Sequence, residues 1–171
     1  MTRRWVLAYS VVLLLGGSAA ASAQQDFSKV EVTSEKIAEG VYMLKGAGGN
    51  VIHGGDTFFN GMYPFIDLSS GGSVNGMIAA ADRMLALAGD GTKIIPGHGP
   101  LGTKADLEAY RDMLATARDR VAALVKAGKT LEQVTAAKPT ADLDAKWGQG
   151  FIKPDPWVSI LYKDLSRPAG R

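Results

Sequence analysis

The sequence predicts one α/β domain, with α+β as the alternative, built from a small mixed sheet and packed helices. Three observations carry this prediction. Short runs of β-forming residues come first, apolar residues then recur at intervals of three and four in longer segments, and residues 24–171 are about one domain in length. The segments follow the order strands, helix, strand and helices, which is typical of α/β and α+β folds.

Residues 1–23 are expected to be a cleavable export signal. Two arginines precede the apolar run 5–15, and the segment ends in Ala21-Ser22-Ala23. That run is shorter than the ~20 residues that span a bilayer, so a retained membrane anchor is the less favoured interpretation. We therefore expect a periplasmic or secreted protein that begins at Gln24. Paired arginines leave both general and twin-arginine export open.

Charge and cysteine content exclude several classes of function. The leader contains two of the 19 basic residues and none of the 17 acidic ones, so residues 24–171 have no net formal charge. A neutral domain argues against a nucleic-acid-binding surface. The sequence has no cysteine, which excludes disulfides and thiolate metal ligands. Stability must therefore come from core packing or from a bound metal.

The first strands are predicted from β-forming residues. Val30-Glu31-Val32 and Val41-Tyr42-Met43-Leu44 flank a turn at Glu39-Gly40, and residues 46–50 are expected to form a loop.

A third, brief strand is expected over residues 51–53, ending at Gly54-Gly55-Asp56. The aromatic stretch 58–66 contains a glycine and a proline, which favours an ordered loop.

A helix is expected from Val74, because its apolar residues recur at helical spacing until Gly89-Asp90-Gly91. Residues 92–95 are expected to form the next strand. That strand leads to His98, which lies between two glycines that permit a tight turn. The helix makes a right-handed crossover between parallel strands the favoured connection.

Three further helices are expected. Thr103 caps a long helix over 104–126, which ends before Gly128. A capping box over Thr130 to Gln133 begins a short helix, and Asp155-Pro156 begins the last one.

Asp56 and His98 are the candidate metal ligands, since each follows a predicted strand. For Asp56 taken alone, a carboxylate that caps its own turn is the commoner interpretation. For His98, a surface histidine in a turn is the corresponding alternative, although a histidine between two glycines has little side-chain packing and is free to aim a ring nitrogen at a metal. His53 is the candidate for a third, weaker ligand, and a structural role is favoured for it.

Other residues have two interpretations as well. Asp67 could approach a site, but capping the following helix is favoured. Trp147, Phe151 and Trp157 could line a substrate mouth, but anchoring the C-terminal segment is favoured.

The sequence contains two motifs, Gly-Asp-Thr-Phe-Phe at 55–59 and Pro-Gly-His-Gly-Pro at 96–100, and the long helix is expected after the second. Together these features resemble the C-terminal half of a metallo-β-lactamase-fold hydrolase of the cyclase-like branch. The segment 37–50 resembles the opening strands of that family. The resemblance implies a partial metallo-β-lactamase-like fold, a zinc cofactor, and a small-molecule substrate. It also implies that Asp56 bridges two metal ions and that His98 binds the second.

The sequence departs from this family in one respect. The His-x-His-x-Asp-His motif is absent, and Asn50 runs directly into Val51, which we interpret as an internal deletion at that junction. A catalytic zinc needs three protein ligands and an open position for water, so Asp56 and His98 alone are too few.

The expected function is therefore that of an exported zinc-dependent hydrolase of esters, amides or lactones whose activity is lost or very weak in this shortened chain. A weak mononuclear metal-binding protein is one alternative. The other is a noncatalytic remnant or interaction module, such as a homodimer that covers apolar faces left exposed by the missing half. No membrane anchor is expected after cleavage.

Overall fold

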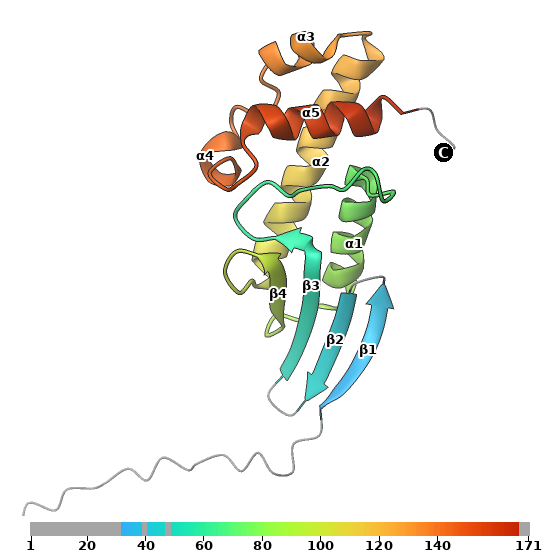
Figure 1. Cartoon of the computed structure of the whole chain (residues 1–171). Coiled ribbons are helices and arrows are strands. Elements are labelled where there is room, and N and C mark those ends of the chain that lie inside the picture. The colour runs from blue at the N-terminus through green and yellow to red at the C-terminus, as the bar shows by residue number, and fades with distance from the viewer. Residues whose placement is uncertain (1–31, 39–40, 47–48, 168–171) are drawn as a thin grey trace, which may run out of the picture.

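Four strands form one mixed sheet in the order β1-β2-β3-β4 (Figure 1). The structure is a computed structural model that describes residues 32–38, 41–46 and 49–167, so the expected signal segment lies outside it. β1 and β2 pair antiparallel, as do β2 and β3, whereas β3 and β4 pair parallel. The strands are β1 (Thr33–Ala38), β2 (Val41–Gly46), β3 (Gly49–Phe59) and β4 (Lys93–His98).

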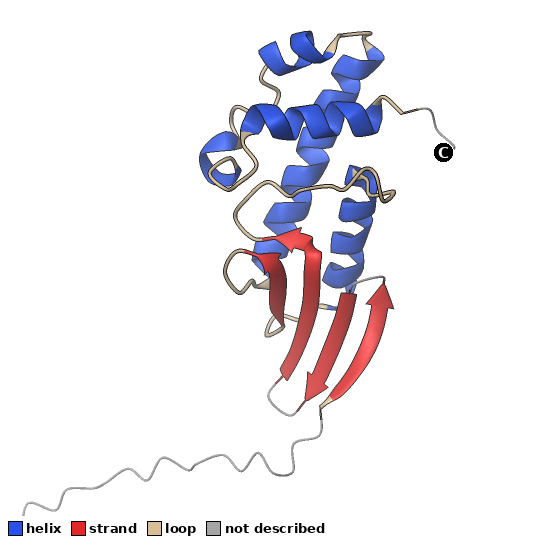
Figure 2. Ribbon diagram, in the orientation of Figure 1, coloured by secondary structure: helices blue, strands red, loops and turns tan. Residues whose placement is uncertain are grey.

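Five helices in the described residues complete a mixed α/β architecture, as predicted. Figure 2 shows two helices, α1 and α2, beside the sheet and the other three beyond one end of its strands. α1 contacts α2 and β3, α2 contacts β4, and α5 contacts both α2 and α3. The helices are α1 (Val74–Leu87), α2 (Lys104–Lys126), α3 (Leu131–Ala136), α4 (Asp144–Trp147) and α5 (Pro154–Leu165). No helix of the described part is both long and apolar enough to span a bilayer.

The sheet buries one face and leaves the other open. The register aligns Met43, Ile52 and Ile94, all of which are buried in the core with residues of α1 and α2. The adjacent row aligns Tyr42 with His53, and both side chains are exposed. Successive side chains of a strand point to opposite faces, so this alternation marks a sheet covered by helices on one side.

The bounds of α1, α2 and α3 agree with the predictions because their ends are encoded locally. Thr103 and Thr130 each begin a capping box, in which the threonine hydroxyl accepts from a backbone N–H three residues later. Ser73 caps α1 in the same way. Gly128 follows α2 with a φ of 71°, the left-handed conformation that glycine adopts at least cost.

The first strand differs from the prediction. β1 covers Thr33–Ala38, and Val32, the described residue of the predicted strand 30–32, precedes it and is 60% exposed. Residues 30 and 31 and the predicted turn at Glu39-Gly40 lie outside the described residues. β1 is an edge strand placed by its backbone pairing with β2, so polar residues are tolerated there and apolar content is a poor guide. The predicted loop over 46–50 is wrong at both ends, because β2 extends to Gly46 and β3 begins at Gly49, which pairs with it, while residues 47 and 48 lie outside the described residues.

β3 is longer than the predicted strand over 51–53. It continues through Gly54, Gly55 and Asp56 to Phe59, with register irregularities on either side of Gly55, whose φ is 48°. Pairing with β4 continues to the Phe59–His98 pair. This parallel partner comes from a distant part of the sequence, so the glycines alone suggested a strand end that the structure does not have.

α5 begins at Pro154 rather than at Pro156, and Lys153 occupies the cap position without a side-chain cap. A proline tolerates the first helical position because it has no N–H to leave unpaired. α4, which was not predicted, has four residues and no side-chain cap. Its Trp147 is buried, so tertiary packing rather than local sequence defines this turn of helix.

α5 and the residue Arg167 beyond it hold the loop that connects β3 to α1. The Asp164 carboxylate accepts a hydrogen bond of 2.7 Å from the Val74 backbone N–H at the first residue of α1. Arg167 donates to the Leu68 carbonyl at 2.8 Å. Residues 60–73 are therefore fixed at the end nearest α1 by the C-terminal part of the chain.

Candidate functional site

Asp56 and His98 lie together at one edge of the sheet. The distance from His98 Nε2 to Asp56 Oδ1 is 3.6 Å, although 42 positions separate the residues in sequence. Their strands, β3 and β4, are parallel and are joined through α1, which brings the carboxyl ends of both strands to the same edge. The predicted proximity of the two side chains is confirmed.

β4 runs to His98 rather than ending at 95, so His98 ends the strand instead of lying in the predicted loop, and glycines allow this end of β4 to approach β3 closely. A Cβ on Gly97 would overlap Asp56 Oδ1 and would lie 2.7 Å from the Gly55 carbonyl carbon. Gly99 has a φ of 96°, and a side chain there would overlap the Asn60 carbonyl oxygen. These positions require glycine for space, and Gly99 requires it for conformation as well.

Asn60 ties this end of β4 to the end of β3. Its backbone N–H donates to the His98 carbonyl at 2.9 Å, and its side-chain amide donates to the Pro100 carbonyl at 3.1 Å. Both acceptors lie at the histidine or just after it, so Asn60 holds the backbone there although the His98 side chain is 47% exposed.

Two phenylalanines pack against the His98 ring. The Phe59 ring stacks on it with centroids 4.8 Å apart, and the Phe151 ring is tilted against it at 5.3 Å. This differs from the expectation that a histidine between two glycines has little packing around it. Phe151 comes from the segment between α4 and α5, so no feature of the local sequence could reveal the contact.

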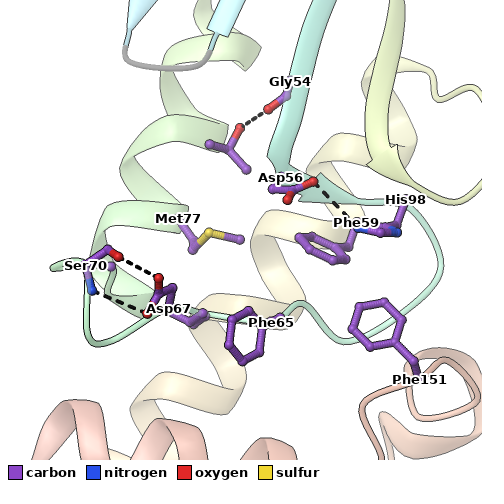
Figure 3. A pocket seen from close by; sticks show the side chains of 12 residues that line it. Gly54, Asp56, Phe59, Phe65, Asp67, Ser70, Met77, His98 and Phe151 are labelled. Atoms are coloured by element: carbon purple, nitrogen blue, oxygen red, sulfur yellow. Dashed lines mark hydrogen bonds and ion pairs between the residues drawn. The ribbon is translucent and has the colours of Figure 1, made fainter.

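A pocket of about 550 Å³ lies beside this pair (Figure 3). Asp56, His98 and Phe151 lie at one end in this view, and Asp67 and Ser70 lie at the other. The wall is formed mainly by apolar side chains, which are Phe59, Phe65, Ile66, Met77 and Phe151. Among these, the sequence singled out only Phe151 as a candidate, and Phe59 and Phe65 were part of the aromatic stretch.

Asp67 caps a turn of the loop rather than the following helix. Its carboxylate accepts hydrogen bonds from the side-chain hydroxyls and backbone N–H groups of Ser69 and Ser70. These hydrogen bonds, led by the Ser69 hydroxyl, lower the pKa of Asp67 to about 2. The favoured prediction of a helix cap is wrong because Ser73 and Asp164 occupy the start of α1.

His53 does not join Asp56 and His98. It is exposed on the open face of the sheet and does not line the pocket. Across residues 32–38, 41–46 and 49–167, no three acidic or histidine side chains cluster in a way that could hold a metal ion. The structure therefore brings together the two main candidate ligands and leaves the third apart.

The three aromatic residues near the C-terminus have different roles. Trp147 and Trp157 are buried anchors, and Trp157 stacks on Tyr63 with ring centroids 5.4 Å apart. Phe151 is 56% exposed and lines the pocket. The anchoring prediction holds for the tryptophans but not for Phe151, for which a place at a substrate mouth stays a prediction.

Comparison with protein-family models gave no match, and comparison with curated proteins gave none either.

Proposed function

We propose that this chain is an exported member of the metallo-β-lactamase-fold hydrolases in which hydrolysis is lost or very weak, and that it retains a low-affinity zinc site formed by Asp56 and His98 at an apolar pocket. The observation that carries the proposal is the 3.6 Å separation of Asp56 Oδ1 and His98 Nε2. The two motifs that resemble the family contribute one of these ligands each.

The separation fits two ligands of one zinc ion. Zinc binds oxygen and nitrogen at about 2.1 Å, and two such ligands at a tetrahedral angle lie about 3.4 Å apart. Both side chains are also accessible, with 78% of the Asp56 side chain and 47% of the His98 side chain exposed. A small rotation of either side chain would suffice to bind one ion.

The residues do not fit the complete dinuclear centre of the family. With His53 on the open sheet face, the described residues supply two ligands, and water must complete the coordination. When bound, zinc would supply a Lewis acid that polarises a carbonyl oxygen. The contribution of the chain is to hold the imidazole between Phe59 and Phe151 and to offer an apolar wall for an ester, amide or lactone.

A second candidate function is an interaction module that forms a homodimer. The open sheet face favours it, because Tyr42 is 41% exposed there and Leu44, Val51 and Ile95 are only half-buried. Apolar side chains on an uncovered face are a common basis for association. Sedimentation at increasing protein concentration would distinguish a dimer from a monomer, and Tyr42→Glu should dissociate the dimer.

Zinc titration by calorimetry tests the main proposal. We expect a dissociation constant in the micromolar range or weaker, because only two protein ligands are available. His98→Ala and Asp56→Ala should each remove most of the binding, whereas the matched control His53→Ala should leave it unchanged. Lowering the pH should weaken binding, because protons compete with zinc for its protein ligands.

Three results would contradict this proposal. Binding of two zinc ions with nanomolar affinity would show that other residues complete the site. Zinc binding that survives His98→Ala and is lost in His53→Ala would place the site on the open sheet face. Rapid hydrolysis of an ester or lactam by the zinc-loaded protein would overturn the proposed loss of activity.

The export part of the proposal has its own test. Intact-mass measurement of the exported protein should show an N-terminus at Gln24. A product that retains the apolar run 5–15 would favour an anchor instead.

A further inference from the structure

The pocket beside Asp56 and His98 is lined by two carboxylates and by no lysine or arginine. Asp56 lies at one end and Asp67 at the other, with the side chains of Phe65 and Met77 between them in the view of Figure 3. Arg167 bonds the Leu68 carbonyl on the same loop, but it does not line the pocket. Among the described residues, the lining therefore offers an anionic ligand no lysine or arginine with which to pair.

Asp67 retains capacity to bind a ligand. Its Oδ1 accepts the two hydrogen bonds from Ser69 and a longer one from the Ser70 N–H, whereas its Oδ2 accepts only the Ser70 hydroxyl, at 2.6 Å. A carboxylate oxygen can accept about two hydrogen bonds, so Oδ2 has one acceptor position to spare. The same hydrogen bonds keep the pKa of Asp67 at about 2, which leaves the group ionised at neutral pH.

The pocket wall between the Asp56 and Asp67 carboxylates suits a ligand that has an apolar body and one positively charged end. Phe65 is 52% exposed and Phe151 is 56% exposed, so both rings are accessible to a ligand. The face of an aromatic ring attracts ammonium groups within about 6 Å of its centre. An anionic ligand of the same shape would meet two carboxylates without a counter-charge.

We propose that the pocket selects small organic cations, with an ammonium group at Asp67 and an apolar body along Phe65 and Met77. The opposite end of the ligand then lies at Asp56 and His98. This inference names the class of ligand that the pocket of the proposed function takes, and it rests on that function only for zinc binding at the end with Asp56 and His98. The charge selectivity itself requires no zinc.

Calorimetry with three matched probes in the presence of EDTA tests the inference on the purified full chain. Phenylbutylamine, phenylbutanol and phenylbutyrate share one apolar body and differ in charge. We expect the amine to bind roughly tenfold more tightly than the carboxylate, with the alcohol between them. Added salt should reduce the difference, because the pocket is open to solvent. Equal or tighter binding of phenylbutyrate, or no binding of any probe at millimolar concentration, would overturn the inference.

Two variants test whether the charge inside the pocket determines the preference for the amine. Asp67→Asn should reduce the preference for the amine several-fold, and the control Asp90→Asn, an exposed carboxylate outside the pocket, should not. Because Asp67→Asn can also loosen its turn, Phe65→Lys serves as a second variant. It places a cation in the pocket from a half-exposed position and should remove or reverse the preference. An unchanged preference in Phe65→Lys would refute the inference.

The zinc titration and the probe titration distinguish failure of the proposed function from failure of this inference. Loss of the proposed function would appear as absent zinc binding with the amine preference intact. Failure of the inference would appear as a lack of amine preference in a protein that still binds zinc through His98.

Discussion

Gly97 occupies the space beneath the Asp56 carboxylate, so that a single added methyl group would overlap its Oδ1 atom. The same methyl group would lie 2.7 Å from the Gly55 carbonyl carbon and 2.8 Å from the Asp56 backbone nitrogen, both of which belong to β3. A side chain could rotate away from the new group, but the strand backbone could not without separating from β4. Close packing of these two strands is therefore what places His98 beside Asp56.

Replacing Gly97 by alanine should destabilise the protein and open the candidate zinc site. We expect a loss of about 1–3 kcal/mol in the free energy of unfolding, because overpacking forces a backbone shift. Zinc affinity should fall in the same variant, since Asp56 and His98 move apart. Denaturant unfolding and calorimetry measure the two effects. Gly91→Ala is the matched control, because its added methyl group would meet no atom within 4 Å.

The hydrogen bond between Asp164 and the Val74 backbone N–H should contribute to stability as a cap supplied by another helix. Asp164→Ala should cost about 1–2 kcal/mol, as the loss of a helix cap does, and Asp164→Asn should cost less because the amide oxygen can still accept. Hydrogen exchange at Val74 should accelerate in the alanine variant. Unchanged protection of that amide would show that the bond does not hold α1, and Asp90→Ala controls for the general loss of a carboxylate.

The turn at Asp67 should make stability depend on pH in acid. Hydrogen bonds from Ser69 and Ser70 lower the pKa of the folded form to about 2, below the value of about 3.9 expected for an unfolded chain. A lowered pKa stabilises the folded state above about pH 4, and this contribution is lost as the pH falls towards about 2. The difference in unfolding free energy between the native chain and Asp67→Asn should shrink over that interval.

Titration of the Asp67 carboxyl carbon by NMR gives a direct check. The midpoint should lie near 2 in the native chain and should rise in Ser70→Ala, which lacks one donor. A midpoint at an ordinary aspartate value would show that the serine hydrogen bonds do not persist in solution.

Local sequence was sufficient for the helices that have strong end signals. The threonines at positions 103 and 130 and the glycine at 128 act on the backbone within a few residues of themselves, so α2 and α3 could be located without any knowledge of the fold. The strands were less predictable. The extension of β3 depends on pairing with β4, which is distant in the sequence, and the exposed, polar β1 carries no burial pattern.

The sequence by itself determined the α/β order of elements, because helix caps and apolar periodicity depend on neighbouring residues, and its resemblance to a known family marked Asp56 and His98 as candidate ligands. Only the tertiary structure decided which side chains meet. It placed His53 on the other side of the sheet from the core, put Phe151 against His98, and brought Asp67 to the far end of the pocket. The physical reason is that these contacts depend on the register of paired strands and on the docking of α5, which act between segments far apart in the chain.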